Sequence, residues 1–187
     1  LFVDGFDRAL KIPDKGYPGM SLQKTESEKA IRGSNEGFGD SIKQNTALIR
    51  KRLRSVDLKV AECKCGRRTG TNVDIMYLDG IVRPEIVTQM QQRLAAFEID
   101  GIGDSGVIEQ LTETQWFSPF PQYQTTRRPD RAVMALLEGR AVLLADNSPE
   151  VLIFPTDYNS FIKTTDDYYT RWEIATFTRT LRYVAAF

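Results

Sequence analysis

The sequence predicts a domain of mixed α and β structure (α/β or α+β), in which helices pack on a mixed β-sheet. Length and composition support this class, because 187 residues with 41% hydrophobic and 27% charged side chains can bury one substantial core. The spacing of apolar residues changes repeatedly between the period of a helix and that of a strand. The resulting order is helix, strand, strand, helix, helix, strand, helix, strand, strand, which is typical of helices packed on a sheet.

The first element is a helix that we expect to begin at Ser34 or Asn35, either of which can cap it, and to end near Ser55. The apolar residues that would share one face of this helix are Phe38, Ile42, Ile49 and Leu53. Its last turns carry the basic residues Arg50, Lys51, Arg52 and Arg54. A basic run can bind nucleic acid, but cations also offset the macrodipole at a helix C-terminus, and we favour the second interpretation.

Two strands joined by a short turn follow this helix. In order they are LKVAECKC (58–65), the turn GRRTG (66–70) and NVDIMYLDG (72–80). The glycine-flanked turn predicts antiparallel pairing, with Val73, Ile75 and Tyr77 on one face of the sheet. Cys63 and Cys65 lie two apart on the first strand, so they point to the same face and we expect reduced thiols.

Two helices follow the hairpin. Pro84 suits the first turn of the earlier one, and its expected buried stripe consists of Ile86, Val87, Met90 and Leu94. Asp104 or Ser105 can cap the later one, whose apolar residues are Val107, Ile108 and Leu111. The preceding GIGDSG stretch is not a GxGxxG in the setting that a dinucleotide requires, so we interpret it as a cap.

The segment TTRRPDR (125–131) leads from a short strand, YQTT, into a helix over 130–138 that Gly139 ends. RAVLLAD (140–146) and EVLIFP (150–155) are then expected to form a hairpin. Their nearly continuous apolar character suits the middle of a sheet that is covered on both faces.

The basic residues of these turns suggest two interpretations. In one, arginines form a fork for the carboxylate of a small molecule, and the candidates are Arg67, Arg68, Arg127, Arg128 and Arg131. In the other, side chains around the turn before helix 130–138 form an internal network of ion pairs and caps, made by Arg128, Asp130, Glu138 and Arg140. We favour the network.

Several classes of function are disfavoured by composition. The chain has no histidine and two cysteines, so it offers neither a Ser/His or Cys/His pair nor the four ligands of a zinc site, and it has no P-loop. We therefore expect no enzyme activity, no metal and no cofactor. The net charge of zero gives no general attraction to nucleic acid, and no such partner is expected. No run of about 20 apolar residues or signal peptide is present in the sequence.

Five stretches together resemble one known family. They are EGFGDSIKQNTALIRKRLR (36–54), GRRTGTNVDIMYLDGI (66–81), IDGIGDSGVIEQL (99–111), SPFPQYQTTRRPDRAVMALLEGRAVLLADNSP (118–149) and DDYYTRW (166–172). In this order and at this spacing they are similar to the N-terminal region of the GerA family. That family comprises the A-type subunits of spore germinant receptors and the related stage V sporulation protein AF, and the sequence leaves the choice between the two open.

The resemblance implies a two-subdomain N-terminal region ahead of several membrane spans. Residues 1–33 would be a remnant hairpin of the first subdomain plus a linker, 34–165 the second subdomain, and 166–187 a juxtamembrane helix beginning near Asp166 and Asp167. Both ends of the chain would then be cut from a longer polypeptide. The side of that helix nearest the membrane would carry Trp172, Phe177, Leu181 and Tyr183.

The resemblance also implies a function without catalysis: nutrient sensing, signal relay and assembly of a membrane complex that promotes ion release. The implied partners are B- and C-type receptor subunits and further A subunits, in the inner membrane of a bacterial endospore. The alternative is an amino acid or sugar bound in the cleft between the subdomains. Two positions depart from the family pattern, since Arg127 stands where an acidic residue is more common and Glu150 where an aromatic one is.

Overall fold

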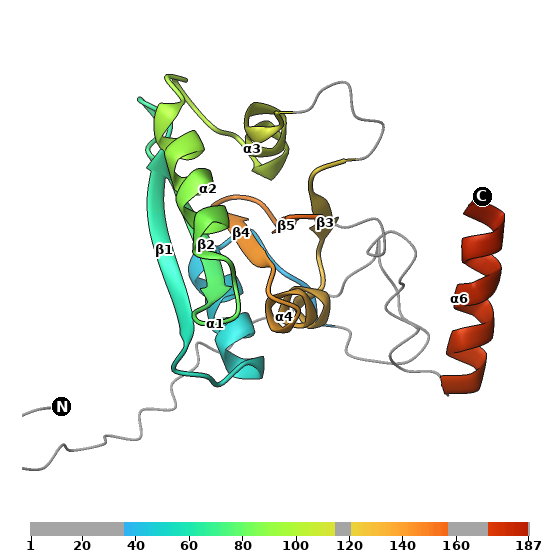
Figure 1. The fold of residues 1–187 in the computed structure, drawn as a ribbon. Coiled ribbons are helices and arrows are strands. Elements are labelled where there is room, and N and C mark those ends of the chain that lie inside the picture. The colour runs from blue at the N-terminus through green and yellow to red at the C-terminus, as the bar shows by residue number, and fades with distance from the viewer. Residues whose placement is uncertain (1–35, 115–120, 157–171, 187) are drawn as a thin grey trace, which may run out of the picture.

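The computed structural model describes residues 36–114, 121–156 and 172–186, and within them the chain forms one five-stranded sheet covered by helices on both faces (Figure 1). In chain order the elements are α1 (Ile42–Arg52), β1 (Leu58–Cys65), β2 (Thr71–Leu78), α2 (Pro84–Ala96), α3 (Ser105–Thr112), β3 (Gln124–Thr126), α4 (Pro129–Leu137), β4 (Ala141–Ala145), β5 (Val151–Phe154) and α6 (Trp172–Ala186). This order confirms the predicted sequence of elements.

The strands lie in the spatial order β1-β2-β4-β5-β3, and each neighbouring pair is antiparallel. Two hairpins, β1–β2 and β4–β5, stand side by side through the pairing of β2 with β4. The short strand β3 then pairs with β5, so β5 lies between β3 and β4. As a consequence, the turn between β1 and β2, the turn between β4 and β5, and the end of β3 share one end of the sheet.

The predicted fold class, an α+β domain with helices packed on a sheet, is confirmed. One detail differs, because the expected mixed sheet is antiparallel at every described strand pair. The reason lies in the β3–α4–β4 connection. This connection makes β4 run parallel to β3, as expected for a helical crossover. However, β5 lies between β3 and β4 and pairs antiparallel with both of them.

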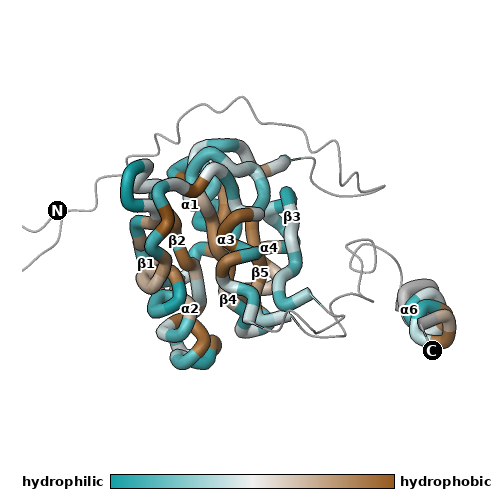
Figure 2. Tube along the Cα trace, turned by 90° about the horizontal axis from the view of Figure 1, so that it is seen from above, coloured by the Kyte–Doolittle hydropathy of each residue, from teal (hydrophilic) through white to brown (hydrophobic). Residues whose placement is uncertain are grey.

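Alternating side chains of the strands form two cores, one on each face of the sheet. One core packs α2 and α3 against β2, β4 and β5, with Ile75, Leu143 and Leu152 fully buried. The other packs α1 and α4 against the opposite face, with Met76, Leu144 and Ile153 fully buried. Figure 2 accordingly shows hydrophobic segments gathered at the sheet and hydrophilic segments around it. All residues of β4 and β5 are buried, as predicted for central strands.

The start of α1 was predicted wrongly, since the helix begins at Ile42 and not at Ser34 or Asn35, which lie outside the described residues. Residues 36–41 run in a non-helical conformation instead. The backbone N–H of Phe38 donates to the Arg127 carbonyl at 2.9 Å, and the buried Asn45 amide bonds both backbone groups of Gly39. These contacts, together with the helix-disfavouring Gly37 and Gly39, replace the predicted first turns.

The other helix boundaries follow the predicted signals. Pro84 occupies the first position of α2, and Asp104 caps α3 by accepting a hydrogen bond from the Val107 N–H at 3.2 Å. At the end of α4, Gly139 adopts φ +82°, its N–H donates to Leu136 and the N–H of Arg140 donates to Ala135. This is the six-residue Schellman arrangement that a glycine at C′ permits.

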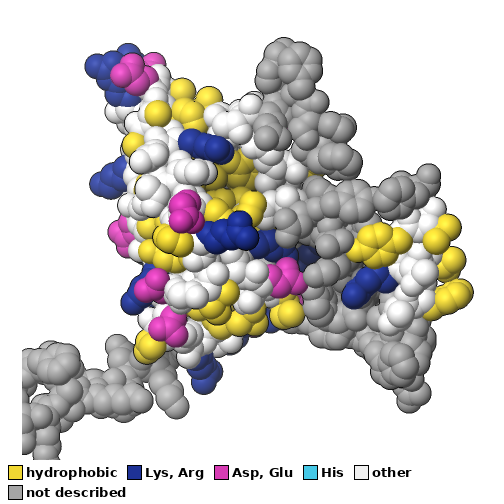
Figure 3. Space-filling view, in the orientation of Figure 1, with side chains coloured by type: hydrophobic (Ala, Val, Ile, Leu, Met, Phe, Trp, Pro, Cys, Tyr) yellow, Lys and Arg dark blue, Asp and Glu magenta, His cyan; other side chains and the backbone are white. Residues whose placement is uncertain are grey.

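Helix α6 stands apart from the sheet and its covering helices in Figures 1 and 2. Its exposed apolar side chains Phe177, Leu181 and Val184 recur at helical spacing, and Figure 3 shows hydrophobic side chains along its outer edge. Within the described ranges, no helix has both the length and the apolar character needed to cross a bilayer. The expected hairpin over 1–33 and the expected helix start at Asp166 and Asp167 lie outside the described residues.

Candidate functional site

The Arg128 side chain lies at the junction of β3 and α4 and is buried, with 3% of its surface exposed to solvent. Its backbone N–H donates to the Thr126 hydroxyl at 3.1 Å. Its guanidinium binds Asp130 through two parallel bonds, Nε to Oδ1 at 3.0 Å and Nη2 to Oδ2 at 2.6 Å. A bidentate pair of this kind uses the fork that would otherwise receive a ligand carboxylate.

The other two members of the predicted network lie at the far end of α4. Arg140 forms an ion pair with Glu138, and its Nη1 donates to the Gln124 side chain at 3.3 Å. The four residues therefore form two pairs, one at each end of α4, so both ends of this helix carry an arginine–carboxylate contact.

Arg127 and Glu150, the two departures from the family pattern, contact each other. Both Nε and Nη2 of Arg127 donate to Oε1 of Glu150, at 3.1 and 2.8 Å. The pair joins the end of β3 to the start of β5 at the surface, with 42% of each side chain exposed. The basic side chain at position 127 thus has the acidic side chain at position 150 as its counter-charge.

Arg67 and Arg68 lie far from the other candidate arginines. They occupy the turn between β1 and β2, where Arg68 makes an exposed contact with Asp100 at 3.5 Å. β1 and β3 are the two edges of the sheet, so roughly 20 Å separates this turn from Arg127 at the usual spacing of strands. Arg131 lies in the first turn of α4, four residues after Arg127. The described structure does not bring the five arginines to one point.

Cys63 and Cys65 are free thiols on the face of β1 that α2 covers. Burial raises the pKa of both, with Asp74 adding to the effect at Cys63 and Cys63 adding to the effect at Cys65. The Cys65 thiol lies 3.9 Å from the Leu94 carbonyl, which it contacts as a weak donor. The described part of the chain holds no group of three or more His, Cys, Asp or Glu residues that could bind a metal.

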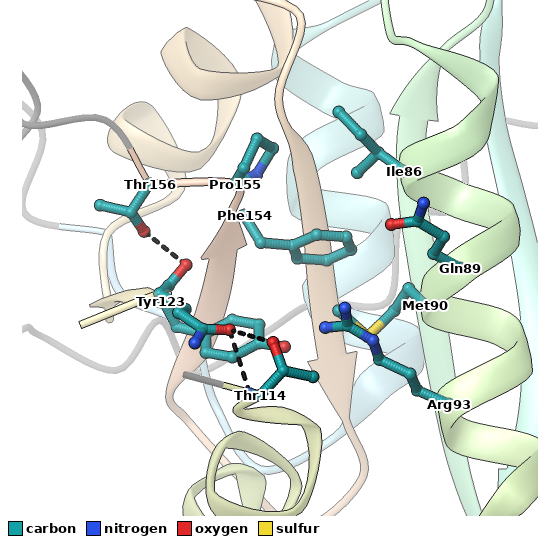
Figure 4. Close-up of a pocket in the computed structure, with 10 residues that line it drawn as sticks. Ile86, Gln89, Met90, Arg93, Thr114, Tyr123, Phe154, Pro155 and Thr156 are labelled. Atoms are coloured by element: carbon teal, nitrogen blue, oxygen red, sulfur yellow. Dashed lines mark hydrogen bonds between the residues drawn. The ribbon is translucent and has the colours of Figure 1, made fainter. Parts of the chain in front are cut away.

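A pocket of about 290 Å³ lies between α2, the end of α3 and the end of β5. Its floor consists of the buried side chains Met90, Tyr123 and Phe154, and the two aromatic rings meet edge to face at 6.1 Å between centroids. Gln89, Thr114 and Pro155 form the exposed rim. Figure 4 shows that Arg93 extends from α2 toward Tyr123, while the Phe154 ring points toward α2.

Hydrogen bonds hold the polar wall of this pocket in place. The Gln122 side-chain oxygen accepts from both the N–H and the hydroxyl of Thr114, and the Thr156 hydroxyl donates to the Gln122 carbonyl at 2.8 Å. Among the described residues, no acceptor contacts the buried amide nitrogen of Gln122. Burial raises the pKa of the Tyr123 hydroxyl, although hydrogen bonds to Thr112 and Arg93 act in the opposite direction, so this hydroxyl stays protonated at neutral pH.

Sequence reasoning missed this pocket, although one signal was available. Ile86, Met90 and Arg93 lie four and three residues apart on α2, so a charged side chain continues the apolar stripe of the helix. A charge on a core-facing stripe indicates either a buried partner or a polar cavity. The other lining residues come from segments that only the tertiary fold brings beside α2.

Comparison with known proteins identifies the class. The family described as Bacillus/Clostridium GerA spore germination protein matches residues 1–187. The chain is 37% identical over 187 residues to spore germination protein KA and 38% identical over 187 residues to the uncharacterized membrane protein YfkQ, both of Bacillus subtilis. It is covered completely in both alignments and spans 34% and 36% of these relatives, so it corresponds to about a third of their length.

A solved structure shares the fold. It is the N-terminal domain of the A subunit of the Bacillus megaterium spore germinant receptor GerK3, with a TM-score of 0.52 and 39% identity over 65% of this chain and 97% of that one. The fold therefore defines a domain of the type found in germinant receptor A subunits. The chain belongs to the GerA family of spore germination proteins.

Proposed function

We propose that this chain is the second subdomain, with flanking segments, of the N-terminal region of a spore germinant receptor A-type subunit. In this role it has no catalytic activity and contributes to nutrient sensing, signal relay and assembly of a membrane complex that promotes ion release. The observation that carries the proposal is the match of the whole chain to the GerA family, together with its likeness to the N-terminal domain of a receptor A subunit. Residues 1–33, 34–165 and 166–187 would be its three parts.

The proposal includes partners and a location. An A subunit implies other subunits in the receptor, and we expect B- and C-type subunits and further copies of the A subunit to be the partners. The parent protein would lie in the inner membrane of the endospore, with this region outside the bilayer. One relative over the whole chain is named as a membrane protein, which supports the membrane part of this proposal.

Helix α6 supplies the proposed link to the membrane. Phe177, Leu181 and Val184 are 65%, 53% and 71% exposed, and their spacing of four and three residues aligns them on one face. An apolar face of this kind on a helix that also carries Arg179 and Arg182 suits the interface of an anionic bilayer. Movement of the sheet domain would then reach the membrane along α6.

The alternative, an amino acid or sugar in the cleft between subdomains, receives less support. The arginines that this alternative would use are divided between two edges of the sheet, and Arg128 is paired with Asp130. The described residues therefore give no single cluster of arginines for such a ligand.

The test is a triple substitution in the full-length subunit, with Phe177, Leu181 and Val184 each replaced by serine. We expect spores with this variant to contain the subunit but to release ions more slowly after nutrient is added, because the apolar contact with the membrane is lost. The matched control is Val56→Ser, which removes a side chain that is 89% exposed in the turn before β1.

Ion release is the readout, and two further measurements control it. Quantitative immunoblotting gives the amount of subunit, and co-purification gives its association with B- and C-type subunits. Normal ion release in spores that lack the gene altogether would remove the proposed function. Normal release in the triple variant alone would remove only the role of α6.

A further inference from the structure

Arg93 is the charged residue of the pocket between α2, α3 and β5, and it has no acidic partner among the described residues. Its Nη1 donates to the Thr112 carbonyl at 3.1 Å, and the described part of the chain places no carboxylate within ion-pair distance of it. Glu109 on α3 influences the pKa of Tyr123 but does not pair with Arg93. By contrast, Arg52, Arg127, Arg128 and Arg140 each bind a carboxylate.

The surroundings of Arg93 limit its solvation. The side chain is only partly exposed and stands beside the buried residues Met90, Tyr123 and Phe154. A guanidinium has five N–H donors in a planar fork, and the Thr112 carbonyl and the Tyr123 hydroxyl do not satisfy all of them. The pocket therefore combines unused cationic donors with an apolar floor.

We propose that this pocket binds a small carboxylate that carries an apolar group. The carboxylate would accept the free N–H donors of Arg93, and the hydrocarbon part would lie on the Tyr123 and Phe154 rings. The inference does not rest on the proposed function, because it concerns binding by residues of this chain alone.

The pocket's chemistry selects this class of ligand over others. Among the described residues that line the pocket, Arg93 carries the one positive charge and no residue is acidic. The pocket therefore favours an anion over a cation. One guanidinium matches a monocarboxylate better than a doubly charged phosphate. A volume of about 290 Å³ lies at the small end for ligand sites, which limits the apolar group to a few carbon atoms.

The experiment compares isovalerate with isovaleramide, which has nearly the same shape but no charge. Each is titrated into the whole 187-residue chain, and binding is followed through the NMR signals of the pocket residues. We expect isovalerate to shift the signals of Met90, Tyr123 and Phe154. Isovaleramide should bind roughly tenfold or more weakly, which is the loss expected when a charge-assisted hydrogen bond is removed.

Substitutions on α2 assign the charge. Arg93→Met should weaken isovalerate binding to the level of the amide, whereas Arg83→Met, which removes an exposed arginine just before the same helix, should leave it unchanged. Arg93→Lys keeps the charge without the fork and should bind at an intermediate level. If Arg93→Met does not fold, this lysine variant and the two ligands on the unchanged chain still decide the question.

Equal affinity for the acid and the amide would overturn the proposal. So would the absence of any shift at the pocket residues, or wild-type binding by Arg93→Met.

Discussion

Arg128 is buried although it carries a charge, and its stability in that position depends on Asp130. The two side chains are 3% and 12% exposed and are joined by two hydrogen bonds. Removal of one partner takes two charge-assisted hydrogen bonds from a charge that stays buried, which costs more than the net strength of the intact pair.

We therefore expect Arg128→Ala or Asp130→Ala to lower the free energy of unfolding by about 3 kcal/mol. Urea unfolding followed by circular dichroism measures this change. Arg67→Ala is the matched control, because it removes an exposed arginine from a turn and should have little effect. A loss at Arg128 no larger than that of the control would contradict the structural role of the pair.

Asp74 is a second residue whose charge is poorly accommodated. It faces α1 from β2 and accepts a hydrogen bond from the Thr46 hydroxyl at 3.2 Å. Burial raises the pKa of Asp74, with Glu62 and Asp146 adding to the effect and Arg50 opposing it. In the unfolded state this carboxyl has its ordinary pKa of 3.8, so it loses its proton at a lower pH than in the folded state. As the pH rises above this value, the unfolded state is therefore favoured and the free energy of unfolding falls.

Asp74→Asn should accordingly raise the free energy of unfolding at neutral pH, since an amide oxygen can still accept the Thr46 bond. The gain should disappear below the ordinary pKa of the carboxyl, where Asp74 is neutral in both states. Urea unfolding of both proteins across this pH range is the measurement. A variant that is less stable than the wild type at neutral pH would show that the charge is needed.

At the scale of the elements, the end of α4 depends on Gly139. The residue has φ +82°, and a Cβ placed there would lie 3.2 Å from the Ile81 carbonyl oxygen. Both the left-handed conformation and the close contact oppose any other residue.

Gly139→Ala should lower the free energy of unfolding by about 1 to 2 kcal/mol. Thermal unfolding by calorimetry provides the value. The control is Gly103→Ala, because a Cβ at that position meets nothing within 4 Å. Equal melting temperatures for the two variants would mean that the turn after α4 relaxes without cost.

The elements also show what the sequence could predict. Strands and most helices could be predicted because their signals are local, as with Pro84 at the start of α2 and Gly139 after α4. The start of α1 could not be, because residues 36–41 are held by distant partners, the Arg127 carbonyl and the Asn147 N–H. The position of β3 beside β5 could not be either, since three residues carry too little pattern to specify a neighbour.

The candidate site was less accessible to sequence reasoning than the fold. Arg93, Tyr123 and Phe154 lie about thirty residues apart along the chain and meet only in the tertiary fold, where they line one pocket. The arginines that the sequence singled out were grouped by residue type, and the sheet separates them by its full width. The contacts of Arg128 with Asp130 and of Arg140 with Glu138 lie within reach of local reasoning, because in each pair a single residue separates the two partners.

On the scale of the whole molecule, the two central strands should be the most stable part. Every residue of β4 and β5 is buried, whereas β1 is an edge strand with alternating exposure. We predict that backbone amides of β4 and β5 exchange with solvent only on global unfolding, and that those of β1 exchange faster through local opening. Hydrogen exchange measured by NMR tests this order. Equal protection in β1 and β4 would indicate that another molecule covers the free edge of β1.

The anchoring of residues 36–41 has a mechanical consequence. Asn147 donates to the Asp40 carbonyl at 2.8 Å, and Asp146 accepts from the Ile42 N–H at 3.2 Å, so the start of the described chain is tied to the turn that begins β5. Phe154 and Pro155 lead the chain away at the other end of the same strand. A pull between these two points would load β5 along its length, across hydrogen bonds to both β3 and β4 that lie perpendicular to it. The domain would then resist tension by shearing many bonds together and would pass force from one flanking segment to the other as a stiff link.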